Sequence, residues 1–132
     1  MLKKVFCPAV ILFTLIFSIS VTAEDYYIDS VTGDDSNAGT SAEKPWASLD
    51  KINSTSFKPG DKILLKAGSE FEGQLKLTSS GDAKHPIVID SYGKGDRPHI
   101  KGQGKVNPAL QLYNCEYVQV NNLEVSNKGQ SR

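Results

Sequence analysis

The sequence predicts an all-β fold, a right-handed parallel β-helix of about three coils that begins with a short capping helix. Apolar residues recur 23 positions apart, turn-forming residues follow the same step, and short segments between them alternate apolar and polar residues. Such a repeat is typical of stacked units that bury their apolar faces against one another. The residues in register are Leu64, Ile87 and Leu110, then Leu77, Ile100 and Leu123, with turns at Gly68, Ser91, Asn114 and at Gly81, Gly104, Asn127.

Residues 1–23 predict a secretory signal peptide that is not part of the fold. A basic start at Lys3 and Lys4 precedes an apolar stretch, and the small residues at its end favour cleavage between Ala23 and Glu24. The alternative is an uncleaved membrane anchor, for which the stretch is only marginally long enough. We therefore expect a secreted protein, whether extracellular, periplasmic or at the cell surface, with no membrane contact after cleavage.

Charge and cysteine content exclude two kinds of function. The chain has 15 basic and 15 acidic residues, and loss of Lys3 and Lys4 with the signal leaves 13 basic ones. This balance argues against a nucleic-acid partner, which needs a basic face. Cys7 would leave with the signal. Cys115 lies among alternating apolar residues, which predicts a buried side chain rather than a reactive thiol.

Residues 24–60 predict a strand, a loop and a capping helix. Residues 25–31 have strand character, and residues 32–40 are rich in Gly, Asp, Asn and Ser, which is typical of a loop. Ser48 is the expected N-cap of a helix that ends at Asn53. We expect this helix and Trp46 to cover the first coil, because an open end exposes apolar side chains and strand edges. For Trp46 the alternative is stacking on a sugar ring.

Residues 61–132 predict the first coils of a longer β-helix, and we expect the chain to be a truncated part of a larger protein. Antiparallel hairpins would also fit the short loops, but they would not keep the 23-residue register. The expected strands are 61–67, 71–78, 86–90, 98–101, 109–113, 117–120 and 123–125.

Several runs of residues resemble the N-terminal region of secreted bacterial proteins in the pectate-lyase-like right-handed parallel β-helix superfamily. They are Gly33–Thr40, Pro45–Leu49, Pro59–Leu65, Pro86–Gly95, Pro98–Ile100 and Leu110–Asn127. The resemblance implies a polysaccharide substrate that binds a groove on coils further along. The expected function is the inactive N-terminal fragment of a lyase that acts on alginate, pectate or a chondroitin-like acidic polysaccharide. The alternatives are a non-catalytic surface or carbohydrate-binding protein and a glycoside hydrolase on the same scaffold.

Lyase chemistry needs a base and a cation that neutralises the substrate carboxylate. The one basic cluster is Lys94, Arg97, Lys101 and Lys105, spread around a glycine-rich turn. The alternative is a solvated corner of the fold. Hydrolase chemistry needs two facing carboxylates, for which Asp90 and Asp96 are the nearest candidates. Both also fit ordinary turn roles.

The loop from Asp34 to Asn37 has the clustered oxygen ligands that calcium favours, but it departs from the EF-hand pattern. The alternative is a loop held by Asx turns. His85 and His99 each neighbour a proline, lack partners at metal-ligand spacing and are interpreted as ordinary residues without a functional role. Three residues predicted to satisfy backbone groups at corners are Asn114, Asn121 and Asn127. The sequence thus assigns no catalytic residue, metal ligand or cofactor to this fragment, and leaves calcium open for a longer parent protein.

Overall fold

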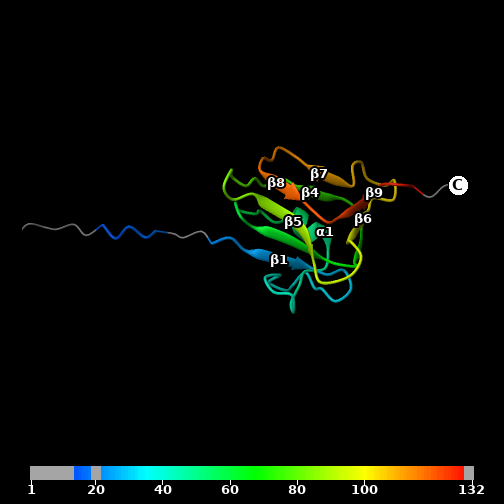
Figure 1. Cartoon of the computed structure of the whole chain (residues 1–132), viewed down its shortest axis with the longest axis horizontal. Helices are drawn as coiled ribbons and strands as arrows, with labels where there is room; N and C mark the ends of the chain where they lie inside the picture. The colour runs from blue at the N-terminus through cyan, green and yellow to red at the C-terminus, as the bar shows by residue number, and fades with distance from the viewer. Residues whose placement is uncertain (1–13, 19–21, 130–132) are drawn as a thin grey trace, which may run out of the picture.

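The computed structural model describes residues 14–18 and 22–129, and these include nine short strands and one helix (Figure 1). Residues 14–18 contain no helix or strand and are exposed. Most of the predicted signal peptide, residues 1–13 and 19–21, lies outside the described residues. Within the described part, no helix has the length and apolar character needed to cross a membrane.

The strands form three parallel sheets. Sheet A has the order β1-β2-β5-β8, sheet B the order β3-β6-β9, and sheet C the order β4-β7. Successive strands from β2 onward enter sheets A, B and C in turn and then repeat this cycle. The predicted all-β class with parallel strands is therefore confirmed. The strands are β1 (Asp25–Ile28), β2 (Lys62–Lys66), β3 (Glu70–Glu72), β4 (Leu75–Leu77), β5 (Ile87–Tyr92), β6 (His99–Lys101), β7 (Leu110–Leu112), β8 (Val118–Val120) and β9 (Glu124–Ser126).

The predicted 23-residue register is wrong. Leu64 pairs with Asp90, whereas Leu110 belongs to sheet C and pairs with Leu75. Ile87 pairs with Val118 instead. Paired residues lie between 25 and 37 positions apart, depending on the sheet. The physical reason is that the connecting loops differ in length, while each pairing is fixed locally by which side chains must point inward.

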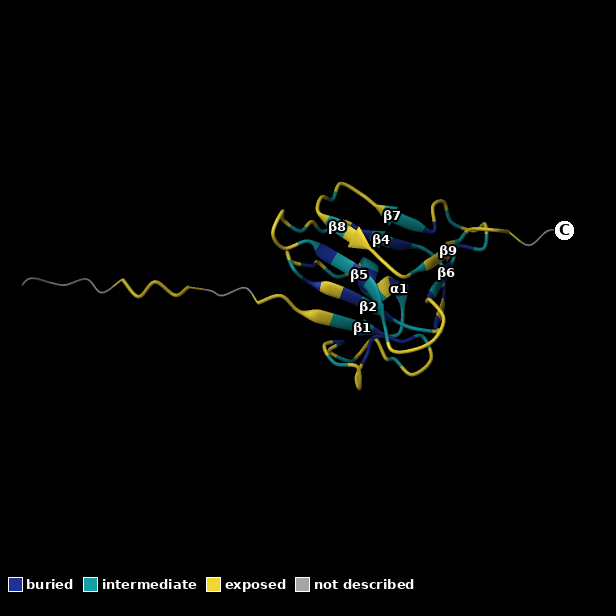
Figure 2. Cartoon of the chain, viewed as in Figure 1, coloured by how far each residue is buried: buried dark blue, intermediate teal, exposed yellow. Residues whose placement is uncertain are grey.

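The core lies between the three sheets, and buried residues alternate with less buried ones along strands such as β2 and β4 (Figure 2). Each of the eight strand residues that point inward is at most 3% exposed. Full burial of one such side chain stabilises the fold by about 1.5–3 kcal/mol. Burial decreases toward β8, where Gln119 and Val120 are exposed. The inward residues of the strands are Ile63, Leu65, Ile87 and Ile89 in sheet A, Phe71 and Ile100 in sheet B, and Leu75 and Leu77 in sheet C.

The predicted strand 71–78 is in fact two strands, β3 and β4, which belong to different sheets. Gly73 lies between them with φ of 116°, a backbone conformation that side-chain-bearing residues rarely adopt. Its N–H donates to the Lys101 carbonyl at 2.9 Å. The chain therefore turns from sheet B to sheet C at this glycine.

The helix α1 (Leu49–Asn53) confirms the predicted N-terminal helix, with Ser48 as its N-cap. Leu49 and Ile52 are buried in the core. The helix packs along the edge of β4, where the Asn53 carboxamide donates to the Gln74 carbonyl and accepts from the Lys76 N–H, both at 2.8 Å. The helix thus covers the first strand of sheet C.

Trp46 belongs to the core, so sugar stacking by this residue is wrong. Its side chain is 4% exposed and stacks on Tyr26 with ring centroids 5.0 Å apart. The indole N–H donates to the Asn37 carbonyl at 2.9 Å. Gly39 makes room for the ring, because a Cβ added there would lie 2.4 Å from Trp46 Cε2.

Candidate functional site

The outer surface of sheet B carries a cluster of polar side chains that we call the polar face. In each of its three strands a central apolar residue is flanked by two polar ones. The central residues Phe71 and Ile100 point into the core, so their neighbours point outward. The parallel register places these neighbours in two rows across the sheet, β6 lying beside β9 (Figure 1). The polar face consists of Glu70, His99 and Glu124 in one row and Glu72, Lys101 and Ser126 in the other.

Contacts between the rows and within the first row hold the side chains in place. Lys101 Nζ lies 2.7 Å from Glu70 Oε1, across β3 and β6. His99 Nε2 lies 2.7 Å from Ser126 Oγ and 3.8 Å from Glu124 Oε1. The side chains of His99 and Lys101 are 20% and 30% exposed, whereas those of the two carboxylates are more than 60% exposed. The side chains of His99 and Lys101 are thus partly buried, and the more exposed carboxylates of Glu70 and Glu124 surround them.

The electrostatics of the polar face favour accepting hydrogen bonds over donating a proton. The hydrogen bond from Lys101 and the positive charge of that side chain lower the pKa of Glu70. Glu70 is therefore a carboxylate at neutral pH. A glycosidase general acid needs the opposite, a raised pKa that keeps its proton at working pH. Each described carboxyl group with a resolved shift has a lowered pKa, namely Asp29, Asp34, Asp35, Glu70 and Asp82.

A shallow pocket of about 200 Å³ adjoins the polar face at β3. Its volume is below the range of about 300–1,000 Å³ typical of small-molecule sites. Glu70 and Glu72 contribute both to this pocket and to the polar face. The pocket therefore extends the face rather than forming a separate enclosed site. Its other lining residues are Ser30, Ala47, Ser48, Leu49 and Phe71.

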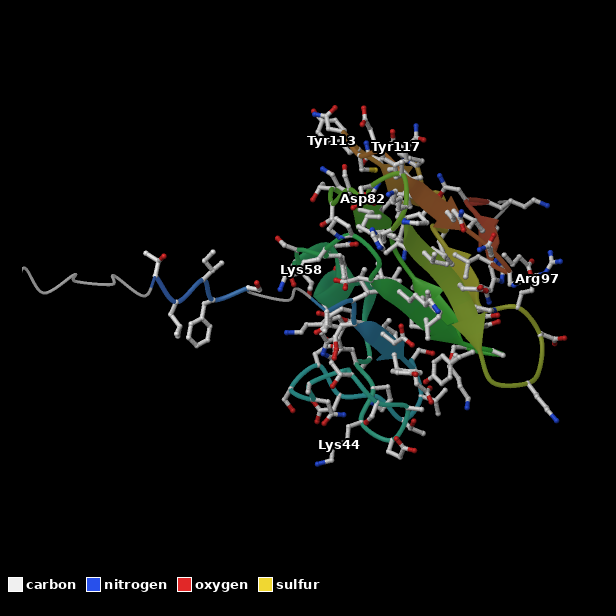
Figure 3. All side chains as sticks on the ribbon, turned by 60° about the vertical axis from the view of Figure 1, so that its left-hand side comes forward. Lys44, Lys58, Asp82, Arg97, Tyr113 and Tyr117 are labelled. Carbon is white, nitrogen blue, oxygen red and sulfur yellow. The ribbon has the colours of Figure 1, made fainter. Side chains whose placement is uncertain are left out.

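The basic cluster predicted for lyase chemistry is not a single site. Lys94 and Arg97 are exposed in the loop between β5 and β6, and Arg97 projects away from the ribbon (Figure 3). Lys101 lies in β6 and is paired with Glu70. Lys105 is exposed in the loop that follows β6. The solvated-corner alternative describes Lys94, Arg97 and Lys105.

The two aspartates considered for a hydrolase have structural contacts. Asp90 Oδ1 accepts from the Ser91 N–H at 2.7 Å and from Asn122 Nδ2 at 2.9 Å. Asp96 is exposed in the loop before β6, where its carbonyl accepts from the Gly68 N–H at 2.7 Å. Asp96 lies in a loop, which is the turn role that the sequence also allowed, whereas Asp90 lies within β5 of sheet A, so a turn role for Asp90 is wrong.

The loop carboxylates considered for calcium are engaged within the loop. Asp34 Oδ1 accepts from the Ser36 N–H at 2.8 Å, as an Asx turn does. Asp35 Oδ1 accepts from the N–H groups of Ala47 and Ser48 at 2.9 and 3.0 Å, and this ties the loop to the start of α1. Among residues 14–18 and 22–129, no group of three or more His, Cys, Asp or Glu is placed to hold a metal ion.

The remaining candidates divide between confirmed and corrected predictions. The Asn127 carboxamide accepts from the Gly104 N–H and donates to the Val106 carbonyl. Its predicted role of satisfying backbone groups is therefore confirmed. His85 is exposed and contacts Asp82. Cys115 is half-buried rather than buried. His99 is part of the polar face, which the sequence reasoning missed because the strands were considered singly. The recurring polar–apolar–polar triplet in β3, β6 and β9 was the available signal.

The chain resembles carbohydrate-cleaving enzymes in sequence and in fold. The chain is 38% identical over 130 residues to a lacto-N-biosidase from Bifidobacterium longum subsp. longum, a match that covers 77% of this chain and 8% of that protein. It also matches two crystal structures of GH136 lacto-N-biosidase from Eubacterium ramulus. The native protein gives a TM-score of 0.75 at 35% identity, and the selenomethionine derivative 0.74 at 38%. Each match covers 82% of this chain and 21% of the other. No family model matches the chain.

These comparisons correct the expected family and activity. The relatives belong to a glycoside hydrolase family, so the pectate-lyase-like assignment and the polysaccharide lyase activity are both wrong. The residues that carried the resemblance explain the error. The run 33–40 and the run 45–49 form the loop, the buried tryptophan and the helix start that cover the sheets. Such residues maintain the fold and do not specify the chemistry.

Proposed function

We propose that this chain is part of a secreted glycoside hydrolase that acts on oligosaccharides and that it forms the opening coils of the enzyme's scaffold. The observation that carries the proposal is the similarity to GH136 lacto-N-biosidase, with a TM-score of 0.75 over 82% of this chain. The chain spans about a fifth of that structure and less than a tenth of the Bifidobacterium longum relative. The activity therefore belongs to the whole protein, in which this chain has a supporting part.

The scaffold that we propose is a right-handed parallel β-helix. Support comes from the order in which the chain enters the sheets, A, B and C in repeated cycles, with every pairing parallel. A connection between parallel strands of one sheet is right-handed in almost all proteins. The strand β1, Trp46 and α1 would then form the cap at one end of the β-helix.

Secretion is proposed from the residues that precede the fold. The basic start, the apolar stretch and the small residues before Glu24 have the order of a signal peptide. Strand β1 begins at Asp25, two residues after the expected cleavage position at Ala23. Cleavage there would leave every strand intact. N-terminal sequencing of protein recovered from the medium or periplasm tests this step.

The polar face is the surface on which we propose that oligosaccharide binds. Its carboxylates accept hydrogen bonds, and Lys101, His99 and Ser126 can donate them, so the face offers both kinds of group to sugar hydroxyls. The lowered pKa of Glu70 suits an acceptor and not a general acid. We therefore assign the face to substrate positioning and not to proton transfer.

Kinetics of the full-length protein on an aryl lacto-N-bioside test these assignments. We expect hydrolysis, and we expect Glu70→Gln and Lys101→Gln to raise KM several-fold while kcat changes little, since these residues would act by binding alone. Glu43→Gln is the control, because Glu43 is exposed in the loop before Trp46. A fall in kcat of a thousandfold or more in Glu70→Gln, which is about the effect of losing a catalytic group, would show that the polar face is catalytic.

A second candidate is a non-catalytic carbohydrate-binding protein. It is favoured by the exposed carboxylates of the polar face, which can accept hydrogen bonds from sugar hydroxyls without any bond being cleaved. Calorimetric titration of the full-length protein with lacto-N-biose separates the two. Binding without turnover of the aryl glycoside would favour this candidate over the hydrolase.

A further inference from the structure

Asp61 is a buried carboxylate that faces the backbone nitrogen of Glu24. Its side chain is 1% exposed, among the most buried in the described residues. Oδ1 accepts from the Glu24 N–H at 2.9 Å, and Oδ2 accepts from the Lys58 N–H at 2.8 Å. The two segments that meet here are 37 positions apart in the sequence. Asp61 therefore joins the start of β1 to the turn before β2.

The carboxylate has hydrogen-bond donors but no counter-charge. Within residues 14–18 and 22–129, no Lys, Arg or His side chain lies in ion-pair distance of Asp61; the ion pairs there involve Asp82, Glu124 and Glu70. A buried charge is costly unless it is both hydrogen-bonded and paired. Both donors to Asp61 are backbone amides. The site therefore supplies the hydrogen bonds that a buried carboxylate needs but not the opposite charge.

We propose that removal of the signal peptide supplies the missing charge, because the new α-ammonium group of Glu24 pairs with the Asp61 carboxylate. The inference rests on the proposed secretion and on cleavage between Ala23 and Glu24. A signal peptidase hydrolyses the Ala23–Glu24 peptide bond with one water molecule. The carboxylate stays on Ala23, and the amine on Glu24 takes up a proton at neutral pH. Processing thus converts an amide–carboxylate hydrogen bond into an ion pair.

The nitrogen of Glu24 is already held in place for this change. The Glu24 carbonyl accepts from the Lys62 N–H at 2.9 Å, and Asp25 is paired with Lys62 in the first register of sheet A. The nitrogen therefore need not move when its bond to Ala23 is broken. Charge-assisted hydrogen bonds are about twice as strong as neutral ones, so the pairing should fix β1 more firmly to the rest of sheet A.

The leaving residue lies in an accessible place. Ala23 is exposed and lines an open pocket of about 510 Å³ together with Pro59, Asp82 and His85. Figure 3 shows Lys58 at the end of the molecule where the N-terminal segment joins the fold. The residue on the leaving side of the Ala23–Glu24 bond is thus exposed to solvent.

The groups that surround the new amine bear on its titration. Opposite charge on Asp61 favours the ammonium form, so the amine should stay charged above the ordinary α-amino pKa of about 7.7. The carboxylates of Glu24 itself and of Asp25, the first residue of β1, also favour the ammonium form. The ammonium groups of Lys58 and Lys62 oppose it. The remaining titratable groups near this end are Tyr26 in β1 and Asp82 and His85 beside the pocket.

The test compares mature chains that differ only at the first nitrogen. One begins at Glu24 with a free amine, one is acetylated at Glu24, and one retains Thr22 and Ala23. We expect the free-amine chain to unfold about 4–8 °C higher at pH 6, the shift that one added interaction of this kind gives in a domain of about 100 residues. The amine's contribution is fully present below its unfolded pKa, and it is lost as the pH rises through its higher folded pKa. Equal midpoints at pH 6, or a gap that persists at pH 11, would overturn the proposal.

Two variants separate the pair from general effects at the terminus. In Asp61→Asn the gap between free and acetylated chains should disappear, whereas in Asp25→Asn, which removes a nearby exposed carboxylate, it should remain. If Asp61→Asn does not fold, the difference in Tm between the free-amine and acetylated chains of the unchanged sequence still tests whether the ion pair forms. N-terminal sequencing of the secreted protein tests cleavage separately. A start other than Glu24 would refute the processing step even where the gap in Tm shows that the pairing forms.

Discussion

Asn53 and Lys76 are joined by a hydrogen bond of 2.8 Å from the Lys76 N–H to the Asn53 side-chain oxygen. The same carboxamide donates to the Gln74 carbonyl. One side chain at the end of α1 therefore occupies the place that a neighbouring strand would take at the edge of β4. This contact explains how a helix of five residues can cover a sheet edge, which would otherwise present unpaired backbone groups.

We expect Asn53→Ala to lower the free energy of unfolding by about 1–3 kcal/mol, because it leaves the Lys76 N–H in β4 and the Gln74 carbonyl just before β4 without their partner. Urea unfolding followed by circular dichroism measures the change. Asn121→Ala is the matched control, since Asn121 is an exposed asparagine outside the helix, and it should shift stability by less than about 0.5 kcal/mol. Similar losses in both variants would contradict the edge role of Asn53.

Gly39→Ala should destabilise the protein far more than Gly68→Ala. Both glycines have positive φ, 76° and 80°, so both substitutions carry the backbone cost of about 1–2 kcal/mol. Only at Gly39 does the added methyl group collide with another side chain, the Trp46 ring. The sequence contains one tryptophan, so its fluorescence reports the site directly. A red-shifted emission in Gly39→Ala and an unchanged one in Gly68→Ala is the expected result.

Lys101→Gln should raise the pKa of Glu70 toward its ordinary value of about 4.3. The cause is the loss of the Lys101 hydrogen bond and charge, which together lower that pKa in the unmodified chain. A lowered folded pKa means that Glu70 contributes stability above its unfolded pKa and that this contribution is lost as the pH falls through the folded value. Carboxyl NMR titration between about pH 2 and 6 measures the midpoint. An unchanged midpoint would show that the ion pair does not form in solution.

Lys94→Ala and Arg97→Ala should leave glycoside hydrolysis by the full-length protein unchanged. Both side chains are exposed in the loop before β6, apart from the polar face. Initial rates on the aryl lacto-N-bioside provide the measurement. A loss of turnover in either variant, without loss of folded protein, would mean that this loop contacts substrate.

The strands β7, β8 and β9 should make the chain associate through its exposed apolar side chains. Each is the outermost strand of its sheet within the described residues, and Figure 3 shows Tyr113 and Tyr117 projecting at this end. Sedimentation velocity of the mature chain should show oligomers that dissociate in Val120→Lys and Val125→Lys, because a charge opposes edge-to-edge pairing. Val31→Lys, at an exposed valine outside these strands, is the control. The exposed residues at this end are Leu112, Tyr113, Tyr117, Val120 and Val125.

The all-β class, the N-cap at Ser48 and the burial of Leu49 and Ile52 could be predicted from local sequence, because each depends on residues a few positions apart. The register of the strand pairs could not be predicted in this way, because the loops between strands differ in length and no fixed spacing relates one paired residue to the next. Trp46 illustrates both cases. Its burial could be predicted from its place just before the helix, whereas its hydrogen bond to the Asn37 carbonyl depends on the folded loop.

The polar face was missed for a related reason. Glu70, His99 and Glu124 are neighbours only because two pairings with different offsets, 29 and 25 residues, place them side by side. No single window of sequence contains them. The activity could not be predicted either, since the runs that carry the resemblance form the loop, the helix start and the strands, which maintain the fold and do not specify the chemistry.

Unequal spacing between paired strands has a consequence for how such a protein can change. Since each sheet fixes its own alignment, residues can be inserted at one corner without shifting the pairing on the other two sides. The 35-residue step between β4 and β7 already contains ten more residues than the 25-residue step between β6 and β9. The loops between the sheets can therefore lengthen during evolution, and they can change which ligand is bound while the paired strands stay as they are.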